Sequence, residues 1–147
     1  MIFLFLKLSR KADYYNFRRK NRGGWVDIFL YLFFVFRKNR LGEKLGLEVG
    51  TENIKEGLLI FHFNNVINPS SLIGKNLHLH GNNCIGNDGK TNNCPVIGDN
   101  VSLGVGAKVI GNVTIANNIK IGAGAVVVHS FLEEGITIGG VPARKIK

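Results

Sequence analysis

Aliphatic residues recur every six positions along the C-terminal two thirds of this chain. A second set lies four positions after most of them and is small or apolar, as at Val101 and Ala107, with Asn83 as a polar member. A six-residue period is typical of a parallel β-helix, in which each repeat forms one side of a stacked coil. The pattern predicts coils over roughly residues 47–128. The main register consists of Ile73, Leu79, Ile85, Ile97, Leu103, Val109, Ile115, Ile121 and Val127.

The register is interrupted at two places. Ile60 and Ile73 lie thirteen positions apart, one more than two repeats, so we expect a loop near 64–70 to absorb the extra residue. The stretch 87–95 is polar and rich in Asn and Gly, and no aliphatic residue marks the corner expected there. Such a stretch predicts a loop that leaves the coil. Loops that leave a repeat scaffold often carry binding residues.

The N-terminal segment alternates apolar runs with basic clusters, and we expect helices at 3–20 and 25–41. The longest apolar run, 28–36, is shorter than the roughly 20 residues that span a bilayer. The first residues also lack the basic start and cleavage site of a signal peptide. The sequence thus predicts a helical segment at 1–46, a β-helix domain at 47–147 and a cytoplasmic protein.

Nearly all of the net charge of +9 lies in the helical segment. Residues 1–46 contain eleven Lys/Arg and three Asp/Glu, a net +8, whereas residues 47–147 contain eight and seven, a net +1. Two interpretations stay open. Residues 1–41 either contact the inner face of an anionic membrane peripherally, or pack on the coils or a sister subunit with their basic side chains solvated. No pattern of a nucleic-acid-binding module is present, so no nucleic acid is expected as a partner.

The two cysteines have neither disulfide-framework nor metal-ligand spacing, so no metal is expected. Histidine is the side chain best suited to act as a base near neutral pH. His62 follows the aliphatic position Ile60 and opens the first interruption, and His78 and His80 flank Leu79.

Residues 47–147 resemble the hexapeptide-repeat acyltransferases, and among them the serine acetyltransferases and related capsular or exopolysaccharide O-acetyltransferases. The matching stretches are VINPS at 66–70, PVIGDNV at 95–101, GAKVIGNV at 106–113, IGAGAVV at 121–127 and GVPAR at 140–144. The resemblance implies a left-handed parallel β-helix, a homotrimer, and acetyl-CoA bound between neighbouring subunits. It also implies that His62 is the catalytic base and that Glu48, fourteen residues earlier, orients it.

Two departures from the family pattern bear on the acceptor. Phe61 stands where serine acetyltransferases have an aspartate, and Cys94 where they have a histidine; both residues help them to hold serine. A segment of 46 residues also stands in place of their larger helical domain. We therefore expect a saccharide acceptor in cell-envelope or capsular polysaccharide biosynthesis, carried on a lipid or a polymer, near Phe61, Asn64, Asn65, His80 and Cys94. Serine O-acetylation and a catalytically idle trimeric scaffold remain the alternatives.

The resemblance also implies which residues contact acetyl-CoA. Small residues and backbone amides would lie along its slender arm, and basic side chains would meet its phosphates. The residues concerned are Gly86, Asn87, Val105, Lys120, Ala123, Arg144 and Lys145.

Overall fold

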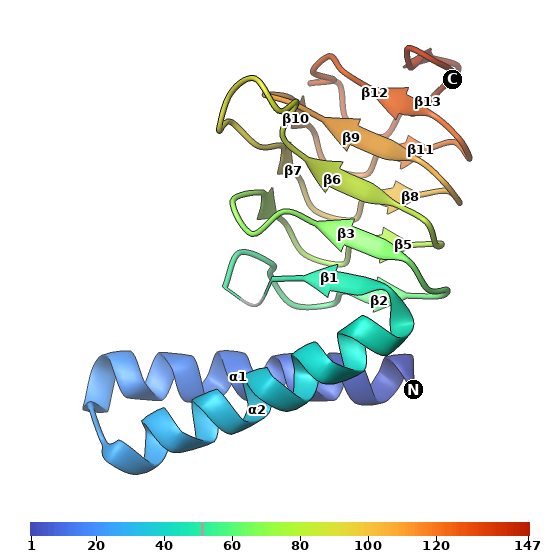
Figure 1. The fold of residues 1–147 in the computed structure, drawn as a ribbon. Helices are drawn as coiled ribbons and strands as arrows, with labels where there is room; N and C mark the ends of the chain where they lie inside the picture. The colour runs from blue at the N-terminus through green and yellow to red at the C-terminus, as the bar shows by residue number, and fades with distance from the viewer. Residues whose placement is uncertain (51) are drawn as a thin grey trace.

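The computed structural model describes residues 1–50 and 52–147. Two antiparallel helices, α1 (Ile2–Arg22) and α2 (Trp25–Leu45), form a hairpin that runs across one end of a stack of short strands (Figure 1). Both predicted helices are confirmed, and each extends a few residues further. None of the helices in the described residues is long and apolar enough to cross a bilayer.

The strands form the three faces of a prism, which the chain visits in turn, and neighbouring strands within each face are parallel except for the last pair of the six-stranded face. The five-stranded face contains β1 (Leu47–Val49), β3 (Asn65–Ile67), β6 (Cys84–Gly86), β9 (Lys108–Ile110) and β12 (Val126–Val127). The three-stranded face contains β4 (Leu72–Ile73), β7 (Val96–Ile97) and β10 (Thr114–Ile115). The six-stranded face contains β2 (Leu59–Ile60), β5 (His78–Leu79), β8 (Ser102–Leu103), β11 (Lys120–Ile121), β13 (Thr137–Gly139) and β14 (Arg144–Lys145). The fold is the predicted left-handed parallel β-helix.

The six-residue register forms the core of the prism. Paired residues such as Val66 and Cys84 lie eighteen positions apart, which is three repeats and one full coil. Because alternate strand residues point to opposite faces, each short strand directs one aliphatic side chain inward. Leu79, Leu103 and Val109 are fully buried. The stack continues beyond the predicted end at residue 128, because Phe131 bridges to Ile115 and β13 pairs with β11.

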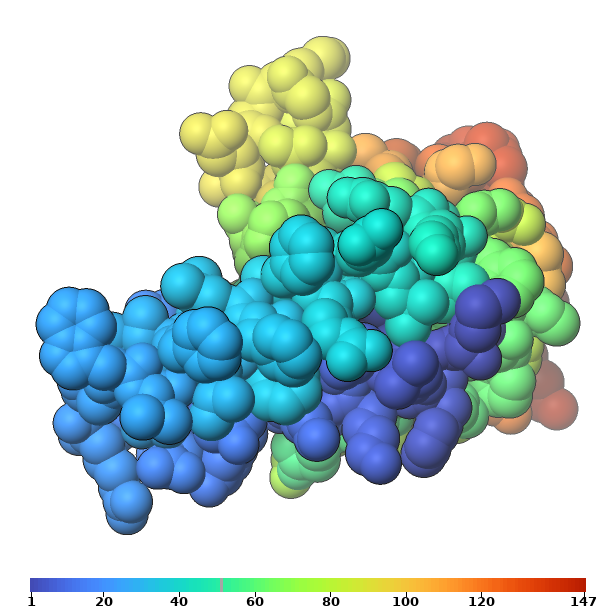
Figure 2. Space-filling model, turned by 60° about the horizontal axis from the view of Figure 1, so that its bottom comes forward, coloured from blue at the N-terminus to red at the C-terminus, as the bar shows by residue number. Residues whose placement is uncertain are grey.

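Both interruptions are seen as irregular turns. Ile60 and Ile67 occupy the same inward register as Leu79 and Ile85 one coil later, but lie seven positions apart instead of six. The extra residue therefore belongs to the turn 61–64, slightly earlier than expected. The loop 87–95 lengthens its coil by one repeat, since Cys84 pairs with Lys108, and it projects from the body of the molecule (Figure 2, yellow).

The hairpin covers one end of the stack through polar contacts and a small apolar cluster. The Arg10 guanidinium donates hydrogen bonds to the carbonyls of Ile54 and Lys55, at 3.2 and 2.7 Å. The buried Lys38 ammonium donates to the carbonyl of Val49 at 2.9 Å. Phe5 is fully buried within the core that the coils form. At the other end, β14 pairs antiparallel to β13.

Candidate active site

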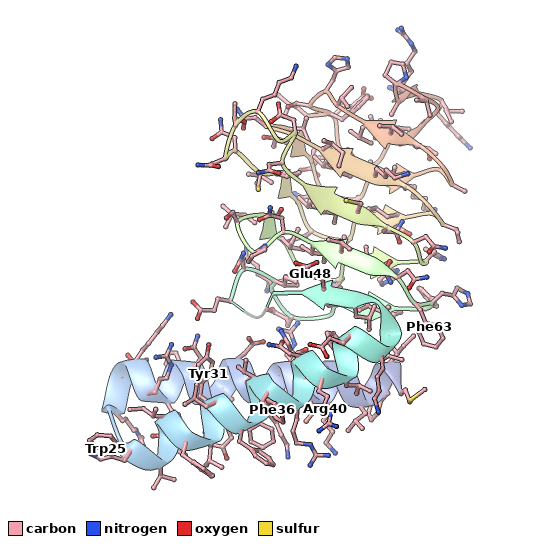
Figure 3. All side chains as sticks on the ribbon, viewed as in Figure 1. Trp25, Tyr31, Phe36, Arg40, Glu48 and Phe63 are labelled. Carbon is pink, nitrogen blue, oxygen red and sulfur yellow. The ribbon has the colours of Figure 1, made fainter. Side chains whose placement is uncertain are left out.

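His62 lies on the turn 61–64, at the corner where the chain passes from the six-stranded to the five-stranded face. The side chains of Phe61, His62 and Phe63 are all exposed on this turn. The His62 carbonyl accepts a hydrogen bond from the Asn65 amide at 2.7 Å, which closes the turn. The turn lies beside the first coil, next to the hairpin, and Figure 3 labels Phe63 there.

Gly81 makes room for His62 in the coil above. Its φ is +122°, and a Cβ built at this position would lie 2.8 Å from the His62 Cβ. Only glycine adopts such a backbone readily. The close approach places the base of the His62 side chain directly against Gly81, next to His80.

Two buried asparagines hold the successive corner turns in place. Asn65 is fully buried, and its Oδ1 accepts a hydrogen bond from the Asn83 backbone N–H at 3.2 Å. Asn83 in turn accepts from the Gly81 N–H at 2.9 Å and donates to the Gly104 carbonyl at 2.7 Å. These contacts occupy the Asn65 amide, so we leave Asn65 out of the proposed acceptor site. Asn64 is exposed with φ +60° and remains beside His62.

An aromatic cluster flanks His62 on the six-stranded face. The Phe61 ring stacks on the His80 ring with centroids 4.6 Å apart and 19° between the planes, and it meets the His78 ring edge-on at 6.1 Å. The His80 Nε2 lies 3.3 Å from the Ser102 hydroxyl, which fixes the orientation of the ring. The sequence predicted Phe61 and His80 at the acceptor site, and the structure brings both together beside His62. Ser102 and Gly81 were not predicted.

Glu48 lies on β1, on the outward side of the five-stranded face. It pairs in register with Val66, and its side chain is exposed. Figure 3 labels it above α2. Within the described residues no hydrogen bond joins it to His62. Glu48 lines a groove of about 550 Å³ between α2 and the first coils, together with Lys38, Glu43 and Pro69.

The projecting loop carries Cys94 and is shaped by Asp88. The Asp88 Oδ1 accepts hydrogen bonds from the backbone N–H groups of Lys90 and Thr91, each at 3.0 Å. These two backbone donors lower the pKa of the Asp88 carboxyl. The Cys94 thiol is half-buried. The described residues contain no group of acidic, His or Cys side chains that could hold a metal.

The residues predicted to bind acetyl-CoA lie on two edges of the five-stranded face. Val105 and Ala123 are exposed on the corner that also carries His62, two and three coils further along the stack. Lys120 lies on β11 and Arg144 and Lys145 on β14, on the adjoining six-stranded face. Gly86 and Asn87, in contrast, lie at the far edge, where β6 ends. A single chain does not bring the two groups together.

The structure is similar to those of serine acetyltransferases. The soybean apoenzyme shares 26% identity with a TM-score of 0.74, over 98% of this chain and 57% of its own. The Neisseria gonorrhoeae enzyme shares 30% with a TM-score of 0.72, over 97% and 53%. The Brucella abortus strain S19 enzyme, solved in complex with coenzyme A, shares 26% with a TM-score of 0.68, over 96% and 54%.

No family model and no curated protein matches the chain. The chain spans a little over half the length of the serine acetyltransferases it matches. Because 96–98% of this chain is covered, the helical hairpin as well as the coils has a counterpart in them. These comparisons confirm the resemblance that the repeats indicated: the chain shares the fold of the serine acetyltransferases, within the hexapeptide-repeat acyltransferase superfamily.

Proposed function

We propose that this protein transfers an acetyl group from acetyl-CoA to a hydroxyl group of a saccharide. The observation that carries the proposal is the turn 61–64, which adds one residue to an otherwise regular corner and presents His62 beside the stacked rings of Phe61 and His80. The same corner continues along the stack as the small exposed residues Val105 and Ala123. A base and a row of small exposed side chains thus share one edge of the prism, and we propose that the thioester lies along this row.

His62 acts as the general base in this mechanism. A hydroxyl is a weak nucleophile, so its proton must be removed as it attacks. The His62 imidazole takes that proton while the acceptor oxygen bonds to the acetyl carbon. The carbon–sulfur bond of the thioester then breaks, and the leaving thiolate takes the proton from the imidazolium. One proton moves through His62, and no other reactant is needed.

Glu48 is proposed as the residue that positions His62. It lies on the five-stranded face one coil before Val66, which follows His62 by four residues. A carboxylate that accepts a hydrogen bond from one imidazole nitrogen fixes the tautomer and stabilises the imidazolium. Glu48→Gln keeps the size and removes the charge, and we expect it to lower the maximal rate while leaving the KM for acetyl-CoA unchanged.

Phe61 favours a saccharide over serine. Aromatic faces carry partial negative charge, so the Phe61–His80 stack suits the C–H face of a sugar ring. Free serine carries an ammonium and a carboxylate, both of which need charged or hydrogen-bonding partners. The immediate neighbours of His62 in sequence, Phe61 and Phe63, offer neither. Serine remains the second candidate, because the similar structures are serine acetyltransferases.

The split in the acetyl-CoA residues supports a homotrimer. Gly86 and Asn87 lie on one edge of the five-stranded face, and Val105 and Ala123 on the other. We propose that these two edges, taken from neighbouring subunits, form each binding groove, with Lys120, Arg144 and Lys145 near the phosphates. The same proposal places the protein in polysaccharide biosynthesis in the cytoplasm, with residues 1–41 in peripheral contact with the inner membrane face.

The test is a thiol-release assay with the full chain and acetyl-CoA. We expect a cell-envelope oligosaccharide to stimulate CoA release and L-serine to leave it unchanged. His62→Ala should reduce the stimulated rate about 10²–10⁴-fold, the usual contribution of a general base. His129→Ala, which removes an exposed histidine near the far end of the stack, is the matched control and should keep the rate. Stimulation by serine alone would identify the acceptor as serine. An unaffected His62→Ala variant would overturn the mechanism.

A further inference from the structure

The side of the hairpin that faces away from the coils carries an apolar and basic surface. A shallow groove on it is lined by residues of the two helices only, and by no residue of the coils. We call this the outer face. It is lined by Leu4, Leu8, Phe33, Phe36, Arg37, Arg40, Leu41 and Lys44. Figure 3 shows Phe36 and Arg40 on the side of α2 turned away from the strands, and Trp25 at the far end of the hairpin.

The outer face exposes large apolar side chains that a helix normally buries. Phe36 is 63% exposed, and Leu32, which lies one helical turn before Phe36 on α2, is 58% exposed. Trp25, at the tip of the hairpin beside this face, is 88% exposed. Contiguous exposed apolar surface of this kind usually marks a contact with a partner or a membrane. Figure 2 shows the hairpin from this side as a broad, continuous surface.

The charge of the hairpin identifies the kind of partner. Residues 1–46 carry a net +8, and two of their three acidic residues are already paired. Asp13 accepts from Arg10 at 3.2 Å, and the buried Asp27 lies 3.1 Å from Arg18. Basic side chains beside aromatic and aliphatic ones fit the headgroups and outer acyl region of an anionic bilayer.

A second copy of the chain fits this surface less well. A two-fold contact brings the same patch of each subunit together, so a hairpin of net +8 would face another of net +8. An anionic bilayer accommodates both the apolar residues and the positive charge of the outer face.

The position of His62 relative to the hairpin adds a consequence for the acceptor. His62 follows β2, in the coil that adjoins the hairpin. An α-helix is about 10 Å in diameter, and successive coils are spaced by roughly 4.8 Å. The stack extends away from the hairpin (Figure 1). A hairpin lying on a bilayer would therefore hold His62 roughly 15 Å above it.

We propose that the outer face rests on an anionic bilayer with the coil stack directed away from it, and that the acceptor is a membrane-proximal sugar of a lipid-linked saccharide. The contact with the bilayer concerns the hairpin alone, whereas the lipid-linked acceptor rests on the proposed acetyl transfer. Separate experiments test the contact and the acceptor.

Vesicle binding tests the contact itself. Trp25 is the single tryptophan and lies at the tip of the hairpin, so its fluorescence reports insertion directly. With vesicles of 70% phosphatidylcholine and 30% phosphatidylglycerol at low salt, we expect a blue shift that pure phosphatidylcholine does not give. Phe36→Glu and Arg40→Glu should each weaken binding about tenfold. The first removes an apolar side chain that the bilayer would bury, and the second replaces a positive charge that would face anionic lipid with a negative one. Leu132→Glu, at a residue 72% exposed in the last coil, is the matched control and should bind normally.

Two results would overturn the contact: no blue shift with anionic vesicles, or equal vesicle binding by Phe36→Glu and the wild type. If binding is equal and the oligomeric state of Phe36→Glu changes, the outer face is a contact between copies of the chain.

Energy transfer tests the orientation without any catalytic readout. In a Trp25→Phe background, a tryptophan is placed either at Phe63, beside His62, or at Leu132. Lipids with dansyl-labelled headgroups receive the excitation energy. Three to four coil spacings separate the two sites, roughly 15–20 Å along the stack. We expect clearly stronger transfer from position 63. Equal or reversed transfer would contradict the orientation.

Acetyl transfer then tests the acceptor. Phe36→Glu should lower the rate on a lipid-linked oligosaccharide in vesicles about tenfold and leave the rate on the same oligosaccharide in solution unchanged. If the variant slows both equally, the membrane-proximal acceptor is wrong. If neither acceptor stimulates CoA release, the proposed acetyl transfer fails, while the vesicle results stand on their own.

Discussion

The helical hairpin and the coil stack use similar apolar residues in opposite ways. Leu79 and Leu103 are fully buried within the coils, whereas Leu32 and Phe29 on α2 are 58% and 68% exposed. Each coil encloses its own interior, so a regular apolar register is buried as the coils stack. The hairpin is covered on one side only. An apolar pattern therefore forms a core only where the fold encloses an interior. Where it does not, the same residues form an exposed surface that can bind a partner.

Two matched leucine substitutions test the difference between the coils and the hairpin most directly. Leu103→Ala should lower the free energy of unfolding by about 2–5 kcal/mol, because it opens a cavity in a close-packed interior. Leu32→Ala, on the outer side of α2, should change it by no more than about 0.5 kcal/mol. Denaturant unfolding of both variants measures the difference. Similar losses would show that the exposed residues of α2 are covered in the assembled protein.

The turns of the coil stack should be nearly as sensitive as its interior. Gly81→Ala forces a strained φ, worth about 1–3 kcal/mol, and also brings a Cβ within 2.8 Å of the His62 Cβ. Gly124 lies on the same corner two coils later, one residue further into the turn, with φ +67° and nothing within 4 Å of a built Cβ. Gly124→Ala should therefore show the cost of a positive φ in this turn without displacing the histidine. We expect only Gly81→Ala to slow acetyl transfer; if both slow it equally, the contact with His62 is unimportant.

Asn83 is a polar residue at an inward position of the coils, where most other residues are apolar. Asn83→Ala removes the acceptor of the buried Gly81 N–H, which costs about 1–3 kcal/mol. The Gly104 carbonyl loses one donor but keeps the Ala107 N–H at 3.1 Å. The exposed Asn112 is the matched control and should tolerate alanine. Thermal unfolding of the two variants provides the measurement. A neutral Asn83→Ala would mean that water replaces the amide.

The junction of hairpin and coils should show the smallest effect, as a dependence on pH. Burial raises the pKa of the Asp13 carboxyl from 3.8 to about 6, although Arg10 acts in the opposite direction. The folded protein therefore binds more protons than the unfolded chain between about pH 4 and 6, and stability falls as the pH rises through that window. Asp13→Asn cannot ionise, so the melting temperature of the wild type should drop relative to this variant between pH 4 and 7. Parallel curves would exclude Asp13 as the cause.

The six-residue register predicted the coils well because each inward position is buried by the same geometry in every turn. It failed in the last coil, where Phe131 follows its bridge partner Ile115 by sixteen residues instead of eighteen. The segment between Val127 and Phe131 is therefore two residues shorter than a regular repeat, and the six-residue period does not anticipate it. The helix ends were underestimated because contacts with the first coil extend α2 to Leu45.

At the candidate site, the sequence predicted His62, Phe61 and His80 as neighbours but not how they are held. Asn65 lies eighteen residues before Asn83 and so shares its inward register, but the extra residue beside His62 hid this relation. The stacking of Phe61 on His80 depends on the pairing of β2 with β5, nineteen residues apart in sequence. No local pattern contains that register. The relation of Glu48 to His62 stays a prediction.

The antiparallel strand β14 has a consequence for how far the stack can grow. A stack of parallel coils presents unpaired backbone N–H and C=O groups at each end. Another molecule can add its own strands to such an open end. Here the backbone of Thr137 forms hydrogen bonds with Ile146 and Lys147, and that of Val126 with Gly140 and Ala143, so the chain folds back over its own last coil. The hairpin covers the first coil. Truncation at residue 139 would expose the edge of the last coil, and we expect the truncated protein to associate end to end into fibres.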